Sequence, residues 1–133
     1  MNFIVFPGQG SQKIGMGKEL SDNFFEAKQV FEEVNDALNF NLTRVMWEGT
    51  NEEISLTSNA QPALMACSIA TLRVLNKITK KKLTDLADYV CGHSLGEYTA
   101  MTAAEVFSLD QCAILLRLRG NAMQEAVPIG KGA

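Results

Sequence analysis

A five-residue segment in the last third of the chain, Gly92-His93-Ser94-Leu95-Gly96, constrains the fold more than any other feature. A short, mostly apolar run over residues 87–91 precedes it, and a helix-compatible run follows it. Strand, Gly-x-Ser-x-Gly, then helix is the context in which this motif forms a nucleophile elbow. The turn is so sharp that the central residue takes a strained backbone conformation, and the glycines let strand and helix approach closely. The pattern predicts that Ser94 is a nucleophile held out at the carboxyl end of a strand.

The surroundings of Ser94 decide between this prediction and a simpler one. A plain glycine-rich turn with an inert serine would show the same five letters, and only the flanking strand and helix favour the nucleophile. The free N–H groups of the following helix's first turn would lie beside Ser94 and stabilise negative charge on a bound oxygen.

Composition restricts the class of protein. The 133 residues suit one compact domain or a piece of a larger one, and 47% hydrophobic residues can bury a sizeable core. A net charge of −3 argues against a nucleic-acid surface. The three cysteines show no CxxC spacing, which indicates buried free thiols in a reducing compartment and no metal knuckle or redox motif. With neither a signal peptide nor a membrane-spanning run, we expect a soluble, cytoplasmic protein.

The N-terminal segment has the pattern of a strand followed by a loop. The continuous apolar run of residues 3–6 predicts a strand buried on both faces, as in a parallel sheet covered by helices. The loop after it is rich in glycine but has neither GxGxxG nor GxxxxGK[ST]. Composition leaves two interpretations of Gln9 open. It belongs to a flexible turn, or the glycines beside it let its side-chain amide donate a hydrogen bond into a neighbouring site.

Apolar spacing predicts several helices. An amphipathic helix is expected over residues 22–38, a short one over 42–47 with Trp47 as a core anchor, and one over 95–104 packed against the sheet. A long, buried helix is expected to begin at Asn59 as N-cap, with Pro62 in its first turn. Gln61 near this start either faces the site or serves as a capping or surface residue. The helix closes with lysines, which we interpret as a solvated helix end or, less simply, a dock for an acidic partner: Lys77, Lys80, Lys81 and Lys82.

The last helix carries an arginine on its apolar side. Ser108-Leu109-Asp110-Gln111 fits a capping box that starts this helix. Its spacing predicts an inward face that includes Arg119, and it places Arg117 on the polar side. A charged guanidinium on a buried face needs an anionic partner, which is either a structural salt bridge or a carboxylate brought by a substrate. The inward residues are Leu109, Cys112, Leu115, Leu116, Arg119, Met123 and Ala126.

Four segments of the chain point together to one family. In order, they are Phe6-Pro7-Gly8-Gln9-Gly10-Ser11-Gln12, Gln61-Pro62-Ala63-Leu64, Gly92-His93-Ser94-Leu95-Gly96-Glu97-Tyr98 and Arg119-Gly120. They closely resemble the malonyl-CoA:acyl carrier protein transacylases of type II fatty acid synthesis, and the resemblance covers essentially the whole chain. It implies an α/β fold: a partial acyltransferase core, with a parallel sheet flanked by helices around the Gly-x-Ser-x-Gly elbow and without the family's ferredoxin-like subdomain. Residues 1–133 would be the N-terminal part of the α/β acyltransferase domain.

The resemblance also implies an activity and a set of site residues. Ser94 would accept malonyl from coenzyme A, and Gln9 with the backbone N–H of Leu95 would form the oxyanion hole. Arg119 would hold the malonyl carboxylate, and Gln61 and His93 are grouped with it as candidate substrate-binding residues. No cofactor is implied, because the coenzyme A thioester is a substrate and the phosphopantetheine of acyl carrier protein is the acceptor. The expected partners are malonyl-CoA and acyl carrier protein, with no nucleic acid and no membrane. Glu97 and Tyr98 match the motif and are interpreted as helix residues.

The chain departs from the family in its catalytic base. The family uses a histidine well downstream of the elbow, whereas this chain has a single histidine, His93. Adjacent residues leaving a strand point to opposite sides, so His93 cannot easily reach Ser94 Oγ, and we interpret it as a structural or supporting residue. We therefore expect a truncated enzyme, weakly active or inactive alone. The sequence leaves open whether a second chain supplies the base. Two alternatives stay open: a non-catalytic module that binds acyl carrier protein, and a serine hydrolase of the α/β-hydrolase kind.

Overall fold

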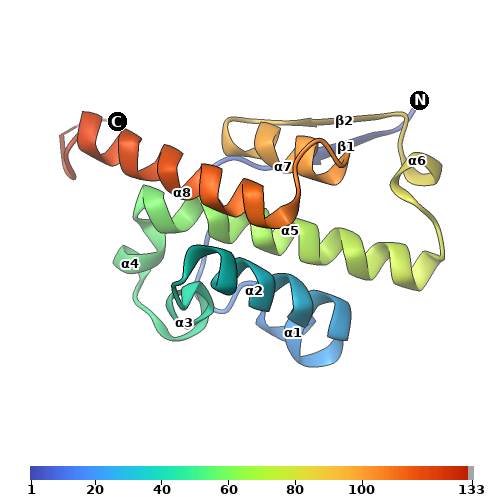
Figure 1. Ribbon diagram of the computed structural model, residues 1–133, viewed down its shortest axis with the longest axis horizontal. Coiled ribbons are helices and arrows are strands. Elements are labelled where there is room, and N and C mark those ends of the chain that lie inside the picture. Colours follow the sequence, from blue (N-terminus) through green and yellow to red (C-terminus); the bar gives the residue numbers. More distant parts are fainter. Residues whose placement is uncertain (132–133) are drawn as a thin grey trace.

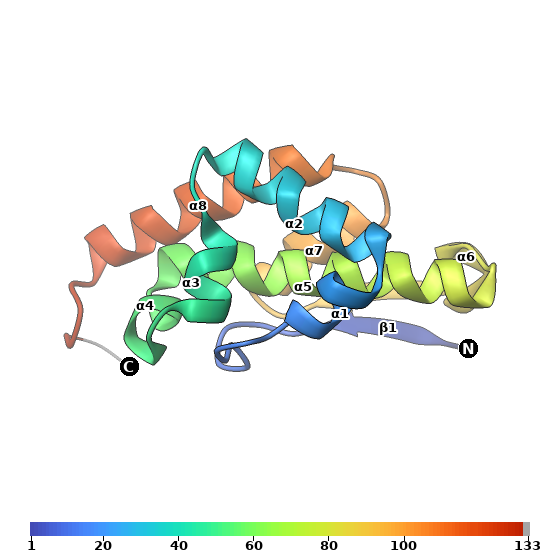
Figure 2. The ribbon, with the colours of Figure 1, turned by 90° about the horizontal axis from the view of Figure 1, so that it is seen from below.

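One long helix, α5 (Thr57–Thr79), runs through the middle of the structure, and the other elements pack around it. The computed structural model describes residues 1–131 (Figure 1). Gly132 and Ala133, which end the predicted acyltransferase segment, lie outside the described residues. Helix α5 contacts α2 (Phe25–Leu38), α7 (Leu95–Ala103) and α8 (Leu109–Ala126), and α2 also packs against α8. The view from below shows α2 and α8 on one side of α5 and β1 on the other (Figure 2).

The predicted parallel sheet is present as two strands, β1 (Phe3–Phe6) and β2 (Tyr89–Gly92). They pair in register from Phe3 beside Tyr89 to Phe6 beside Gly92. Helix α7 packs on both strands and also on α5. The carboxyl ends of the two strands therefore lie side by side at the start of α7, which is where the elbow is built.

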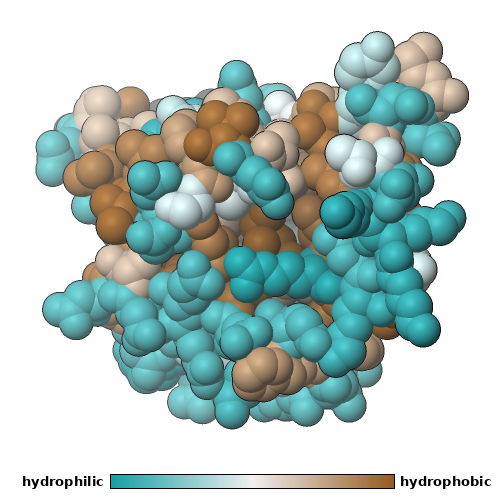
Figure 3. Space-filling view, turned by 45° about the vertical axis from the view of Figure 1, so that its right-hand side comes forward, coloured by the Kyte–Doolittle hydropathy of each residue, from teal (hydrophilic) through white to brown (hydrophobic). Residues whose placement is uncertain are grey.

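The prediction that the first strand is buried on both faces is wrong. Phe3 is 56% and Val5 65% exposed, and their neighbours on β2, Tyr89 and Cys91, are exposed as well. The reason is that helices of the described chain cover only one face of the sheet, where Phe6 packs with Leu72 and Ala100. In Figure 3 hydrophobic surface gathers mostly in the upper half of the molecule, at the level of the sheet and α7, above a mostly hydrophilic lower half.

The predicted helix over residues 22–38 is two helices, α1 (Lys18–Asn23) and α2. Phe24 between them has an extended backbone, with φ −132° and ψ 120°. The side-chain amide of Asn23 donates to the Glu19 carbonyl at 2.8 Å, which satisfies a terminal carbonyl of α1 and helps to end it. Phe24 packs against the core cluster, so its burial holds the break in place.

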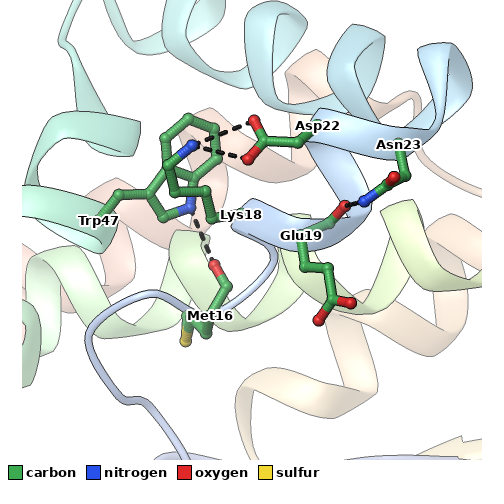
Figure 4. Close-up of polar contacts among 6 residues, drawn as sticks. All are labelled: Met16, Lys18, Glu19, Asp22, Asn23 and Trp47. Carbon is green, nitrogen blue, oxygen red and sulfur yellow. Dashed lines mark hydrogen bonds and ion pairs between the residues drawn. The ribbon is translucent and has the colours of Figure 1, made fainter.

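The helix predicted over residues 42–47 is confirmed as α3 (Leu42–Glu48), and Trp47 is a core anchor as predicted. Its ring meets Phe31 edge to face at 5.5 Å between centroids. Its indole Nε1 donates to the Met16 carbonyl at 3.0 Å, which fixes the end of the glycine-rich loop, while Lys18 lies over the ring and pairs with Asp22 (Figure 4). Two short helices were not predicted: α4 (Asn51–Ser55), capped by Thr50, and α6 (Leu83–Leu86).

The start of α5 differs from the prediction. The helix begins at Thr57, so Asn59 is inside its first turn and Pro62 in the second. A contact from the far end of the chain explains the earlier start, because Gln124 on α8 accepts a hydrogen bond from the Ser58 N–H at 2.8 Å. A distant side chain thus caps α5, and this cannot be seen in local sequence.

Helix α8 begins with the predicted capping box at Ser108, which is confirmed. Its buried face is Leu109, Cys112, Ala113, Leu116 and Gly120. Leu115 (37% exposed), Met123 (44%) and Ala126 were predicted to face inward but lie outside this face. Within residues 1–131, no helix combines the length and the apolar composition needed to cross a bilayer.

Candidate active site

Ser94 lies in the short turn between the end of β2 and the first residue of α7. Its backbone has φ 55° and ψ −115°, a left-handed conformation that a residue with a Cβ rarely takes. A Cβ on Gly92 would overlap the backbone of Gly96, and one on Gly96 would overlap the Phe6 carbonyl. Only glycine at both positions lets α7 start so close to the two strands, and this closeness holds Ser94 at their carboxyl ends.

The guanidinium of Arg119 lies against the nucleophile. Arg119 Nη2 donates to Ser94 Oγ at 3.1 Å, and Nη1 donates to the side-chain carbonyl of Gln61 at 2.8 Å. The Gln61 side chain is 1% exposed, and its amide Nε2 contacts the Met123 sulfur at 3.3 Å. Three elements therefore meet at one point: the elbow, the second turn of α5 and the last half of α8.

Close approach of α8 to α5 brings Arg119 there. A Cβ on Gly120 would lie 2.6 Å from Ser58 Cα and 2.8 Å from the Thr57 carbonyl oxygen, so only glycine fits between the helices. The ring of Tyr98 also faces the guanidinium, with 5.6 Å between Arg119 Cζ and the ring centroid.

No carboxylate neutralises Arg119 within the described part of the chain. The ion pairs found there are Lys18–Asp22, Lys28–Glu32, Arg73–Glu33 and Lys77–Glu26. The neighbours of the Arg119 guanidinium are a neutral amide, a hydroxyl and an aromatic ring. Of the two partners that the sequence left open for this arginine, the structural salt bridge is therefore not formed among residues 1–131.

The two predicted oxyanion donors come from the elbow itself and from the glycine-rich loop. The N–H groups of Gly96 and Glu97 donate to the carbonyls of His93 and Ser94, whereas the Leu95 N–H has no acceptor among residues 1–131. Gln9 is exposed on the glycine-rich loop, and its Nε2 donates to Thr57 Oγ1 at 3.3 Å. One N–H of that amide stays available, and Gln9 is held at the start of α5 rather than on Ser94.

His93 sits on the other side of the turn. Its backbone N–H donates to the Phe6 carbonyl at 3.2 Å, and a Cβ on Gly8 would come within 2.5 Å of its Nδ1. The ring thus packs over the start of the glycine-rich loop. No hydrogen bond joins it to Ser94 in the described residues.

A groove of about 1070 Å³ opens beside this cluster. It runs between the glycine-rich loop, the α4–α5 junction and the end of α8, and it shares Gln9 and Met123 with the site. A ligand that reached Ser94 from this side would pass over these two residues.

Sequence reasoning missed two contacts of the site. Tyr98 was interpreted as a helix residue, although its position four residues after Ser94 places both on one face of the helix start, which is a usable signal. Arg117 was placed on the polar side of α8 but is half-buried: its Nη1 donates to Asn59 Oδ1 at 2.7 Å, and its guanidinium lies over Phe40. Burial lowers the pKa of Arg117. Helical periodicity alone gave no signal for this contact.

The chain is similar to acyltransferases over its whole length. A family model described as an acyl transferase domain matches residues 3–133. The malonyl CoA-acyl carrier protein transacylase of Bacillus subtilis (strain 168) is 48% identical over 98% of this chain and 39% of its own length. The transacylase of the same name from Haemophilus influenzae is 41% identical over 98% of this chain and 41% of its own length.

Solved structures show the same similarity. The crystal structure of acyl-carrier-protein-S-malonyltransferase from Bartonella henselae has a TM-score of 0.92 and 52% identity, covering 98% of this chain and 41% of that one. A malonyl-transacylase in complex with a type II polyketide synthase acyl-carrier protein has a TM-score of 0.86 and 42% identity, and the match covers 96% of this chain and 40% of that one. The chain thus spans about two fifths of the length of the relatives it matches. The prediction of a partial acyltransferase core is confirmed.

Proposed function

Because the chain belongs to the acyl transferase domain family, we propose that it carries the acyl-accepting part of a malonyl transfer site. Ser94 is the nucleophile, and Arg119 binds the carboxylate of the acyl group. The contact between Arg119 and Ser94 Oγ, with no carboxylate oxygen of residues 1–131 within 4 Å of the guanidinium, carries the proposal. A partly buried guanidinium without a counter-charge favours an incoming anion, and its planar fork suits a carboxylate.

The chemistry of malonyl fits this distance. In a malonyl thioester, one methylene separates the free carboxylate from the carbonyl carbon that is attacked. The residue that binds the carboxylate must therefore lie within a few ångströms of the nucleophile, and Arg119 Nη2 is 3.1 Å from Ser94 Oγ. A simple acetyl or fatty acyl group would leave the guanidinium without an anion.

The reaction we propose is ping-pong acyl transfer. Ser94 Oγ attacks the thioester carbonyl and loses its proton to a base, the C–S bond breaks, and coenzyme A leaves as the thiol. The phosphopantetheine thiol of acyl carrier protein then attacks the malonyl-serine ester and regenerates Ser94. The free Leu95 N–H and the Gln9 amide stabilise the oxyanion in both halves of the reaction.

We propose that the base that takes the Ser94 proton is not a residue of this chain. His93 packs over the loop at Gly8 and makes no hydrogen bond to Ser94 within the described residues. We propose that residues 1–133 are the N-terminal part of the acyltransferase domain, and that full activity needs a base from elsewhere. Location in the cytoplasm is likewise a prediction.

Acyl carrier protein is the proposed partner, and we place its approach to Ser94 away from the lysine cluster. Lys80, Lys81 and Lys82 are exposed just past the end of α5, and Lys77 pairs with Glu26. At about 1.5 Å per residue along the helix, Lys80 lies about 28 Å from Gln61. A carrier protein that delivers its thiol to Ser94 would more naturally approach from the groove beside Gln9 and Met123.

Intact-protein mass measurement after incubation with malonyl-CoA tests the proposal. The wild type, Ser94→Ala and Arg119→Ala are compared with and without free imidazole, which supplies a base. We expect imidazole to promote one malonyl adduct on the wild type, none on Ser94→Ala and much less on Arg119→Ala. Acetyl-CoA is the matched control substrate. Arg119→Ala should lower the yield of the acetyl adduct far less than the yield of the malonyl adduct.

Two results would contradict this function. Equal adducts on the wild type and on Ser94→Ala would remove Ser94 as nucleophile, and equal malonyl and acetyl losses in Arg119→Ala would remove the carboxylate role. If no adduct forms but the chain co-elutes with acyl carrier protein in gel filtration, unchanged in Ser94→Ala, the non-catalytic binding module is favoured.

A further inference from the structure

Tyr98 is the motif residue that the proposed function leaves without a role, and its ring contacts the proposed carboxylate-binding group. The distance from Arg119 Cζ to the Tyr98 ring centroid is 5.6 Å, within the range of a cation–π interaction. The ring is partly buried and stacks on Phe107, with 6.4 Å between centroids and 20° between planes. Its position is therefore fixed by α7 and by the loop before α8.

We propose that Tyr98 is a positioning residue that makes the site selective for acyl groups bearing a carboxylate. This inference rests on the proposed function of Arg119. The ring's face attracts the guanidinium without accepting its N–H groups, so the donors that a carboxylate needs stay available. An aspartate or glutamate in the same place would neutralise the charge and occupy the donors.

The contact matters most after the acyl group has been transferred. In the described structure three neighbours orient the guanidinium: Gln61, Ser94 and Tyr98. Once Ser94 Oγ is an ester oxygen, its electron density is drawn into the acyl carbonyl, and it accepts from Arg119 Nη2 more weakly than the hydroxyl does. Gln61 then holds one nitrogen, and the guanidinium could swing about that hydrogen bond. The Tyr98 ring limits the swing and keeps the fork directed at the carboxylate.

Malonate binding, followed by NMR on the isotopically labelled 133-residue chain, tests this inference without requiring turnover. The observed signals are the Arg119 Nε–H and the Leu95 amide, and acetate is the matched ligand. The variants are Tyr98→Phe, Tyr98→Leu and Tyr98 replaced by trifluorophenylalanine, which keeps the ring's shape but weakens the negative face. Phe25→Leu is the control, because it removes an exposed aromatic ring that has no contact with Arg119 or Tyr98 among those found.

We expect Tyr98→Phe and Phe25→Leu to bind malonate within about twofold of the wild type. Tyr98→Leu and the fluorinated ring should bind it about fivefold more weakly, which corresponds to about 1 kcal/mol. Acetate binding should change less. The ring-current shift of the Arg119 Nε–H should be present in the wild type and lost in Tyr98→Leu.

Each outcome separates this inference from the function it rests on. If the fluorinated ring binds malonate as well as Tyr98→Phe does, Tyr98 acts by packing and the inference is wrong. If circular dichroism shows that Tyr98→Leu does not fold, the malonate affinities of Tyr98→Phe and of the fluorinated variant still test the inference. If the wild type shows the ring-current shift but binds no malonate, the carboxylate site fails and the specificity role of Tyr98 falls with it.

Discussion

The backbone conformation of Ser94 predicts that glycine at this position gives a more stable protein than alanine, the reverse of the usual order in a helix. At φ 55° and ψ −115°, a residue with a Cβ is strained by about 1–3 kcal/mol, whereas glycine is not. Ser94→Ala and Ser94→Gly both remove the hydroxyl that accepts from Arg119, so this loss cancels when the two variants are compared. The remaining difference between them is the strain, which alanine keeps and glycine releases.

The expected magnitude follows from two opposing terms. Strain relief stabilises the glycine variant by about 1–3 kcal/mol, and the greater freedom of glycine in the unfolded chain offsets about 0.4–1 kcal/mol of it. Ser94→Gly should therefore be more stable than Ser94→Ala by about 1 kcal/mol, within a range of about 0–2.6 kcal/mol. At an ordinary helical site the order is reversed, so Ser21 in α1 serves as the control: there alanine should be better than glycine by about 1 kcal/mol.

Urea unfolding followed by the fluorescence of Trp47, the single tryptophan, measures these differences. Far-ultraviolet circular dichroism should give the same midpoints if unfolding is two-state. An alanine variant at position 94 that is as stable as the glycine variant, with the expected order at position 21, would refute the reasoning. The turn would then hold Ser94 without strain.

Three further predictions concern packing, thiols and the oxyanion hole. Gly120→Ala should destabilise the fold by about 1–3 kcal/mol in urea unfolding, because the new methyl group meets the backbone at Ser58, and unchanged stability would contradict the close helix contact. Cys112 should be alkylated more slowly than the exposed Cys91, because burial raises the pKa of the Cys112 thiol and blocks access to it. The difference between the two alkylation rates should become smaller as pH rises and the Cys112 thiolate forms. Equal rates at pH 8 would contradict this prediction. Gln9→Ala should slow imidazole-supported malonylation about 10²–10³-fold, and a near-normal rate would exclude Gln9 from the oxyanion hole.

The features that the sequence predicted correctly are those with a local cause. The Gly-x-Ser-x-Gly turn and the Ser108 capping box each depend on residues within a few positions of one another. The α5 start was misplaced because its cap, Gln124, comes from α8. The partly buried Arg117 was missed for the same reason, since its partners Asn59 and Phe40 are distant in sequence and helical spacing carries no information about them.

The same long-range contacts connect the fold to the candidate site. Arg117 and Arg119, two positions apart on α8, donate to Asn59 and Gln61, two positions apart on α5. Residues two apart on a helix point in nearly opposite directions, so the two hydrogen bonds lie on either side of the line where Gly120 meets α5. A rotation of α8 about its axis that lengthened one of these hydrogen bonds would compress the other. The pair of arginines therefore fixes the rotation of α8, and with it the placement of the Arg119 guanidinium on Ser94.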